Sequence, residues 1–324
     1  MKWLRIVAPA LALAFAAAAL PATAQTVLNV NTALTTDDPM YAGLERFKAA
    51  VEKRSAGKLS VRIFPGSQLG KDEDVLEQAR AGANVAVLVD GGRLAPFVKE
   101  FGILGAPYLV DNFDQVLRLE QAPLFKGWVD KLRNAASLQV LSFDWFQGHR
   151  HVLTNVPVKV PADLKGVRMR TPGAPVWLET VRAMGATPTG MPWSEVYSAL
   201  QTKVIDGAEA QHPAVYGARL YEVVKHITKT EHIYLITGII TSRAWYDKLP
   251  ADQQAILREE SFAAGKWASE ATIASLADYE KKLREKGVTI TEIDKAPFKA
   301  ATAGVYQTLG YADLRREVDK VLGR

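Results

Sequence analysis

Two arginines, Arg150 and Arg170, carry the clearest chemical signal in the sequence. Arg150 lies in the segment Gly148–His151, and Arg170 ends the predicted strand Gly166–Arg170. A guanidinium group binds a carboxylate through two parallel hydrogen bonds, which a lysine ammonium cannot reproduce. A carboxylate in a cleft needs such a partner, because its desolvation costs several kcal/mol. The two residues therefore indicate an organic-acid site, although a pair of surface arginines also fits the residues alone.

Other reactive side chains give weaker signals. His149 and His151 stand two apart on a predicted strand and so face the same side, but a pair lacks the third ligand of a metal site. The acidic run Asp72–Asp74 has no EF-hand loop around it, so we expect the solvated start of a helix. The phosphate-loop, dinucleotide-binding, G-x-S-x-G and H-E-x-x-H motifs are absent. We expect no enzyme activity and no cofactor; a hydrolase whose triad assembles in space is the enzymatic alternative.

Length and composition limit the class of protein. The chain has 324 residues, enough for about two domains, and 48% hydrophobic with 23% charged residues is ordinary globular composition. There are 40 Lys and Arg against 35 Asp and Glu, mixed along the chain, so we expect no nucleic-acid partner. Cysteine is absent, which excludes disulfides, zinc–thiolate sites and a cysteine nucleophile.

The start of the chain has the three parts of a secretory signal peptide, which we place at residues 1–24. Two basic residues precede the apolar stretch Ile6–Leu20, and Ala22–Ala24 fits the small-residue cleavage pattern. A membrane anchor is the alternative, but roughly 15 apolar residues are fewer than the about 20 that span a bilayer. We therefore expect an exported, periplasmic protein that begins at Gln25 and is soluble.

The pattern along the rest of the chain predicts an α/β protein. Val27–Ala33, Lys58–Phe64 and Val85–Val89 are typical of strands, and helical patterns separate them. The middle of the chain shows the same alternation of strand and helix patterns. The other predicted strands are Gln139–Phe143, His149–Thr154, Gly166–Arg170, Ala186–Thr189, Val204–Ala208 and Tyr234–Ser242, and predicted helices include Lys71–Gly82, Pro175–Met184 and Ser194–Gln201.

One long helix is predicted over Ala251–Lys286, with Pro250 before it and Gly287 after it. Its length of about 54 Å, at about 1.5 Å per residue, exceeds a single domain, so the helix should lie across two lobes. Two helices that break near Gly265 are the alternative. No Pro- or Ser-rich linker separates the lobes, so we expect the chain to cross between them more than once.

Several ordered motifs give the chain a resemblance to a known family. Val167–Pro172 resembles that family's "Gly-(Leu/Val)-Lys-(Ile/Leu)-Arg-(Val/Thr)-Pro" strand, and Ser194–Gln201 followed by Asp206–Glu209 resembles its "SEVYxALQ…DGxE" signature. Shorter matches are Ser67–Gly70, Ala106–Leu109 and Thr230–His232. From about Asn29 past Lys248 the chain resembles the periplasmic substrate-binding proteins of TRAP (tripartite ATP-independent periplasmic) transporters, the C4-dicarboxylate and sialic-acid binding group.

The resemblance implies a two-lobed α/β periplasmic binding protein fold. Hinge strands and the long lobe-spanning helix would join the lobes, with the ligand between them. Lobe I is expected at residues 25–147 plus 236–275, and lobe II at residues 148–235 plus 276–324.

The resemblance also implies site residues. Arg170 falls on the arginine that binds the ligand carboxylate in this family, and Arg150 falls on its second ligand arginine. Arg168, two residues before Arg170 on the same side of an ideal strand, falls on a more variable basic position. The other expected ligand-binding residues are Trp193, Gln147, Asp90, Gln211, Tyr234 and Ile236.

The expected function is a monomeric receptor that binds an organic acid and delivers it to the TRAP membrane subunits. Apolar residues in Tyr234–Thr237, where sugar-acid binders are more polar, favour an apolar or aromatic acid over a polyhydroxylated sugar acid such as sialic acid. Arg150 would supply the second cation that a dicarboxylate needs. A ligand-sensing module of a signalling receptor is the alternative function.

Overall fold

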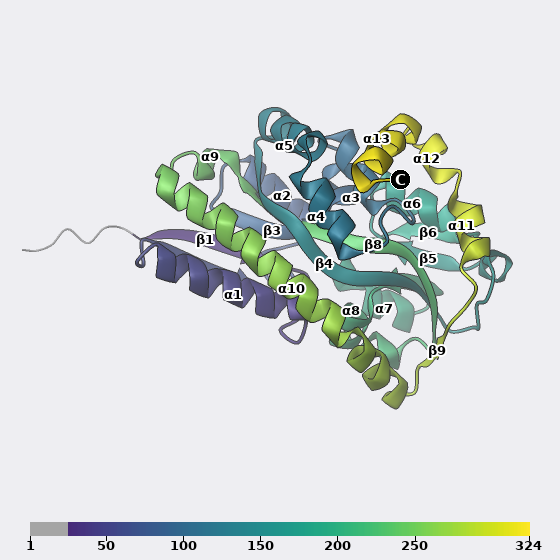
Figure 1. Cartoon of the computed structure of the whole chain (residues 1–324). Coiled ribbons are helices and arrows are strands. Elements are labelled where there is room, and N and C mark those ends of the chain that lie inside the picture. The colour runs from purple at the N-terminus through teal and green to yellow at the C-terminus, as the bar shows by residue number, and fades with distance from the viewer. Residues whose placement is uncertain (1–24) are drawn as a thin grey trace, which may run out of the picture.

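A computed structural model describes residues 25–324, so the expected signal peptide lies outside the described residues. One mixed sheet runs through the middle of the molecule, with helices on both of its faces (Figure 1). The strand order is β2-β1-β3-β8-β4-β7-β5-β6, and β9 pairs with β8. The strands are β1 Thr26–Asn31, β2 Leu59–Phe64, β3 Val85–Asp90, β4 Leu138–Thr154, β5 Arg168–Thr171, β6 Thr187–Gly190, β7 Gly207–Ala210, β8 His226–Ser242 and β9 Thr289–Thr291.

The long antiparallel strands β4 and β8 connect two smaller groups of strands. β1, β2 and β3 pair in parallel on one side, which we call the first half. β5, β6 and β7 pair in parallel on the other side, the second half. The sequence predicts two strands where β4 is one, because four register shifts between Val140 and Val152 interrupt its alternation. It also predicts only the apolar end of β8, because Lys229 and Glu231 interrupt the pattern before it.

Helices fill the connections between the strands. The α-helices are α1 Pro39–Arg54, α2 Asp72–Arg80, α3 Gly91–Leu94, α4 Phe113–Gln121, α5 Pro123–Ala136, α6 Pro175–Ala183, α7 Val196–Gln201, α8 His212–Gly217, α9 Arg243–Tyr246, α10 Ala251–Glu285, α11 Ala296–Thr302, α12 Val305–Thr308 and α13 Ala312–Leu322. The 3-10 helices are η1 Lys99–Gly105, η2 Pro161–Leu164, η3 Trp193–Glu195 and η4 Leu220–Glu222. The predicted helix at Ser194–Gln201 is therefore a 3-10 turn followed by a short α-helix.

The long helix α10 is a single helix of 35 residues that lies along the whole molecule (Figure 1). Gly265 does not break it, because the missing side chain serves a close approach. A Cβ atom at Gly265 would lie 2.5 Å from Asp144 Oδ1 and 2.7 Å from Trp145 Nε1. Ser269 Oγ accepts a hydrogen bond from the backbone N–H of Phe146 and donates one to the carbonyl of Asp144, both at 2.8 Å. The helix is thus fixed to the middle of β4, between the two halves.

The hydrophobic core is divided in the same way as the sheet. Two clusters cover the two faces of the first half, one of which also includes Val176 and Trp177 of α6, and two smaller clusters lie in the second half. The C-terminal helix α13 departs from the expected assignment of residues 276–324 to the second lobe. Its Val318 and Leu322 are buried in the same cluster as Val87 and Val89 of the first half. The apolar face of α13 therefore packs on the first half of the sheet, although α11 lies against the second half.

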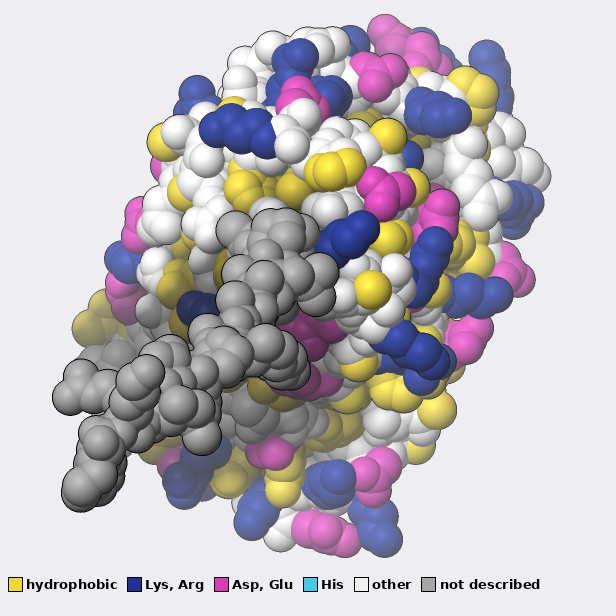
Figure 2. Space-filling view, turned by 90° about the vertical axis from the view of Figure 1, so that its left-hand side faces the viewer, with side chains coloured by type: hydrophobic (Ala, Val, Ile, Leu, Met, Phe, Trp, Pro, Cys, Tyr) yellow, Lys and Arg dark blue, Asp and Glu magenta, His cyan; other side chains and the backbone are white. Residues whose placement is uncertain are grey.

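Among residues 25–324, none of the helices combines the length and apolar composition that crossing a bilayer requires. On the part of the molecule visible in Figure 2, basic and acidic side chains are interspersed. This mixture agrees with the even distribution of charges in the sequence.

Candidate functional site

The candidate site is a cavity between the two halves of the sheet. Its walls come from the carboxyl ends of β1, β3 and β5 and from the middle of β4 and β8, the place where open α/β sheets bind ligands. The lining residues are Thr32, Ala33, Leu34, Asp72, Leu88, Val89, Asp90, Arg93, Gln147, Arg150, Arg170, Pro172, Trp193, Gln211, Ala214, Leu235 and Thr237.

Arg170 enters the cavity from β5 and is only 1% exposed. Its Nε and Nη2 atoms donate to the carbonyl of Met191 at 2.9 and 2.6 Å, and its Cζ lies 5.4 Å from the ring centroid of Trp193. No ion pair within the described part of the chain includes this guanidinium. Burial, with the nearby charge of Arg150, lowers the pKa of Arg170 to about 9. Arg170 is therefore a buried cation that lacks a counter-charge.

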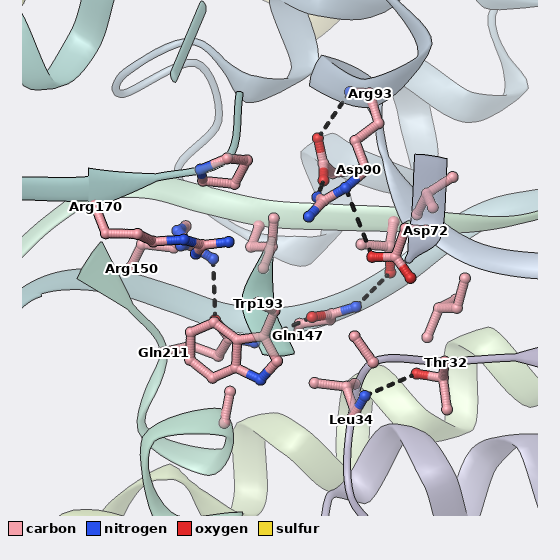
Figure 3. Close-up of a pocket in the computed structure, with 17 residues that line it drawn as sticks. Thr32, Leu34, Asp72, Asp90, Arg93, Gln147, Arg150, Arg170, Trp193 and Gln211 are labelled. Atoms are coloured by element: carbon pink, nitrogen blue, oxygen red, sulfur yellow. Dashed lines mark hydrogen bonds and ion pairs between the residues drawn. The ribbon is translucent and has the colours of Figure 1, made fainter. Parts of the chain in front are cut away.

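Arg150 lies beside Arg170 in Figure 3 but has a carboxylate partner. Its Nε pairs with Glu209 Oε2, and its Nη2 donates to Glu209 Oε1 at 2.7 Å. Thr171 Oγ1 donates to the same carboxylate at 2.8 Å, and His232 Nε2 lies 3.5 Å from it. Burial alone would raise the pKa of Glu209, but Arg150 and His232 hold it at about 2. Glu209 thus neutralises the charge of Arg150. Arg150 differs in this respect from Arg170, which has no carboxylate partner.

The opposite wall of the cavity holds three charged groups of the first half (Figure 3). Arg93 pairs with Asp90 Oδ2, and its Nε lies 3.6 Å from Asp72 Oδ2 and 2.9 Å from Glu73 Oε1. Burial opposes the charge of Arg93, but these carboxylates raise its pKa. Asp72 Oδ1 is buried without a hydrogen-bond partner. Burial raises the pKa of Asp72 to about 6, with Arg93 opposing the rise.

A chain of polar side chains joins the two walls. Arg150 Nη1 donates to Gln211 Oε1 at 3.3 Å, and Gln211 Nε2 donates to Gln147 Oε1 at 3.0 Å. Gln147 Nε2 then donates to Thr237 Oγ1 at 3.3 Å. The amides of Gln147 and Gln211 are fixed by these bonds and present donors and acceptors to anything bound in the cavity.

Two of the expected site residues, Tyr234 and Ile236, do not line the cavity, although apolar residues such as Leu34, Leu88 and Leu235 form part of its walls. Tyr234 and Ile236 point to the other face of the sheet, where both are buried in the core of the first half and Tyr234 stacks on Phe146 at 3.8 Å. Their neighbours Leu235 and Thr237 line the cavity instead. Successive side chains of a strand alternate between faces, so an assignment shifted by one residue selects the wrong set. The other six expected residues line the cavity, and Arg168 lies outside it in an exposed pair with Asp206.

The acidic run and the histidines also differ from their interpretations. Asp72 is not solvated but lines the cavity, a role that its position just after the Ser67–Gly70 match could have suggested. A register shift between Arg150 and Val152 separates the two histidines of β4. The ring of His149 contacts Tyr234, whereas that of His151 lies 4.5 Å from His212. Within residues 25–324, no three His, Asp or Glu side chains are placed to hold a metal ion.

Thr32, Arg93 and Thr237 are site residues that the sequence reasoning missed. Thr32 follows β1, Arg93 lies on α3 and Thr237 lies on β8, so these residues meet in the cavity only when β1, β3 and β8 assemble. Together the walls offer one unpaired guanidinium at one end and carboxylate oxygens at the other. Such an arrangement suits an anionic group facing Arg170 and a hydrogen-bond donor facing Asp72.

A family model and a curated relative that match this chain indicate the same family. The family model described as bacterial extracellular solute-binding protein, family 7, matches residues 30–313. The C4-dicarboxylate-binding periplasmic protein of Rhodobacter capsulatus is 32% identical over 73% of this chain and 71% of its own length.

Two solved structures of TRAP periplasmic solute-binding proteins match nearly the whole chain. One from Escherichia fergusonii, in an apo open form, is 46% identical with a TM-score of 0.80 and covers 91% of this chain and 99% of its own. One from Ochrobacterium anthropi with bound L-fuconate is 31% identical with a TM-score of 0.89 and covers 92% of this chain and 100% of its own.

Proposed function

The chain belongs to family 7 of the bacterial extracellular solute-binding proteins, the periplasmic receptors of TRAP transporters, and from this premise we propose that it captures a hydroxylated organic acid for uptake. Arg170 would bind the carboxylate of this acid between two lobes. The loaded receptor would then deliver it to the membrane subunits of the transporter. The family consists of solute-binding receptors rather than enzymes.

The unpaired guanidinium of Arg170 is the observation that carries this proposal. Arg150 and Arg93 are the other arginines that line the cavity, and both have carboxylate partners. Arg170 has only the carbonyl of Met191 and the ring of Trp193. A buried charge is stable when it is paired and fully hydrogen-bonded, so the missing partner corresponds to a ligand carboxylate.

The opposite wall supports a hydroxylated acid rather than a dicarboxylate. Asp72 and Asp90 present carboxylate oxygens there, and Asp72 Oδ1 has no partner. A ligand hydroxyl would donate to this oxygen, whereas a second ligand carboxylate would be repelled by it. The L-fuconate bound by the Ochrobacterium anthropi protein, a monocarboxylate with several hydroxyl groups, has this chemistry. The proposed ligand class replaces the apolar or aromatic acid expected from the sequence.

The proposed lobes correspond to the two halves of the sheet, with the boundaries given above except that α13 joins lobe I. Lys71 of the first half pairs with Glu195 of the second at 2.9 Å, so the halves are in contact at the mouth of the cavity. The chain superposes better on the L-fuconate-bound protein than on the more similar apo open protein. Both observations support a closed arrangement like that of a liganded receptor.

A thermal-shift screen against carboxylates tests the proposal. L-fuconate and other hydroxylated monocarboxylates should raise the Tm of the mature protein, and succinate and benzoate should raise it less. The Arg170→Ala variant should lose the shift, and the matched Arg168→Ala variant should keep it. A larger shift with succinate or benzoate would contradict the ligand class, and no shift with any carboxylate would contradict the receptor function itself.

A further inference from the structure

Trp177 occupies a place between the two halves that the proposed function does not use. It lies on α6 in the second half and is only 1% exposed. Its Nε1 donates to Asp90 Oδ1 of the first half at 3.1 Å. Its ring centroid lies 4.7 Å from the guanidinium carbon of Arg150. One indole thus contacts a cavity residue from each side of the boundary.

The first half has a seat for this indole, formed by two glycines. A Cβ atom at Gly92 would lie 2.0 Å from Trp177 Nε1 and 2.6 Å from its Cδ1. A Cβ atom at Gly105 would lie 3.3 Å from the same nitrogen. Neither glycine has a positive φ, so the backbone does not require glycine at either position. The missing side chains therefore serve the close approach of the indole.

Asp90 is held in place partly through this contact. Its Oδ1 also accepts from the backbone N–H of Arg93 at 3.2 Å, and its Oδ2 pairs with the Arg93 guanidinium. The indole N–H is the only one of these donors that comes from the second half. If the halves separate, Asp90 loses that donor, whereas Arg150, which lies in the same half as Trp177, keeps the ring beside it.

We propose that Trp177 is a positioning residue that couples closure of the halves to completion of the ligand cavity. When the indole lies on Gly92 and Gly105, it orients Asp90 for the bound acid. This inference rests on the proposed function, because it requires a receptor whose halves move relative to one another. A tryptophan that only stabilised one half would not need a glycine seat on the other.

The Gly92→Ala variant tests the seat directly. Its new methyl group overlaps the indole only when the halves are closed, whereas its contact with Asp90 Oδ1, at 2.9 Å, lies within the first half and persists in the open protein. The double variant Gly92→Ala with Trp177→Ala separates the two contacts, because it removes the overlap with the indole and keeps the contact with Asp90. The chain has no cysteine, so cysteines introduced at the exposed Gln78 and Gln201 would be the only sites for spin labels. Distances between these labels, measured by pulsed electron resonance without and with L-fuconate, give the open and closed populations.

We expect the wild type to show a closed population in at least one of these conditions. Gly92→Ala should lower the ratio of closed to open molecules at least tenfold, and Gly92→Ala with Trp177→Ala should restore part of it. Trp177→Phe, which loses the N–H donor to Asp90 together with the part of the indole that packs on Gly92, should lower the ratio at least tenfold. Gly127→Ala on α5, where a Cβ atom meets nothing within 4 Å, is the matched control and should behave like the wild type.

Three results would overturn the inference: closure of Gly92→Ala like the wild type, no restoration in the double variant, or a wild type that never closes. A Gly92→Ala protein with lowered Tm and altered circular dichroism would show that the seat is structural, which also contradicts it. Failure of the proposed function gives a different result. L-fuconate would then leave the wild-type distances unchanged, while the closed population without ligand would still depend on Gly92.

Discussion

Replacing Asp144 by asparagine should stabilise the protein in a manner that depends on pH. Asp144 lies in the middle of β4 beneath α10, where neither carboxyl oxygen has a hydrogen-bond partner and Oδ1 faces Gly265. Burial, reinforced by the charge of Glu120, raises the pKa of Asp144 from 3.8 to about 8. The carboxyl group is therefore protonated and neutral in the folded protein below that pH.

The sign of the effect follows from proton binding. Between about pH 4 and pH 8 the folded protein holds a proton on Asp144 that the unfolded chain has released. The free energy of unfolding therefore falls as pH rises through this range and changes no further once Asp144 is ionised in both states. A gap of about four between the two pKa values corresponds to about 5 kcal/mol, and relaxation around the carboxylate should leave about 2–3 kcal/mol to be measured.

Urea unfolding followed by circular dichroism at pH 5 and pH 9 measures this effect. Asparagine resembles the neutral carboxyl group in shape, so Asp144→Asn should exceed the stability of the wild type by a small margin at pH 5 and by about 2–3 kcal/mol at pH 9. The control is Glu270→Gln, at an exposed position of α10, the helix that covers Asp144; its stability relative to the wild type should not change with pH in this way. An equal difference between Asp144→Asn and wild type at both pH values would refute the reasoning.

Two further predictions concern the cavity. Glu209→Gln leaves the buried Arg150 without its counter-charge and should lower the free energy of unfolding by about 3–5 kcal/mol. The double variant Glu209→Gln with Arg150→Met removes both charges and should lower it less. Equal losses for the two variants in urea unfolding would contradict the ion-pair argument. Asp72→Asn removes the negative charge that disfavours a second ligand carboxylate. The affinity for succinate relative to that for L-fuconate, measured by calorimetry at pH 8, should therefore rise about tenfold. An unchanged ratio would contradict the proposal that Asp72 selects against dicarboxylates.

Parts of the fold that depend on local pattern could be predicted from the sequence. The long helix is uninterrupted between Pro250 and Gly287, so its bounds follow within one residue. The spacing of apolar residues likewise predicts β2 and β3. Arg170 could be placed at a strand end, and the motif match distinguished it from Arg168.

Other parts depend on contacts that no local pattern records. Bulges in β4 change which side chains share a face, and a shift of one residue in β8 exchanges Tyr234 for Leu235 in the cavity wall. Asp72 resembles an ordinary acidic helix start until β1, β3 and β5 place it in the cavity. Trp177 has the pattern of a core residue of an amphipathic helix, and only its contacts with Asp90, Gly92 and Gly105 in the structure show that it reaches the other half.

The affinity of Arg170 variants for the acid that most stabilises the wild-type protein tests the central claim most directly. Removing one partner of a buried charge pair costs about 2–5 kcal/mol, so Arg170→Ala should weaken binding by roughly 30-fold or more in calorimetry. Arg170→Lys should fail nearly as badly, because an ammonium cannot form two parallel hydrogen bonds with a carboxylate. Arg168→Ala, which breaks only the exposed pair with Asp206, should bind like the wild type. Loss of binding in Arg168→Ala together with intact binding in Arg170→Ala would contradict the account.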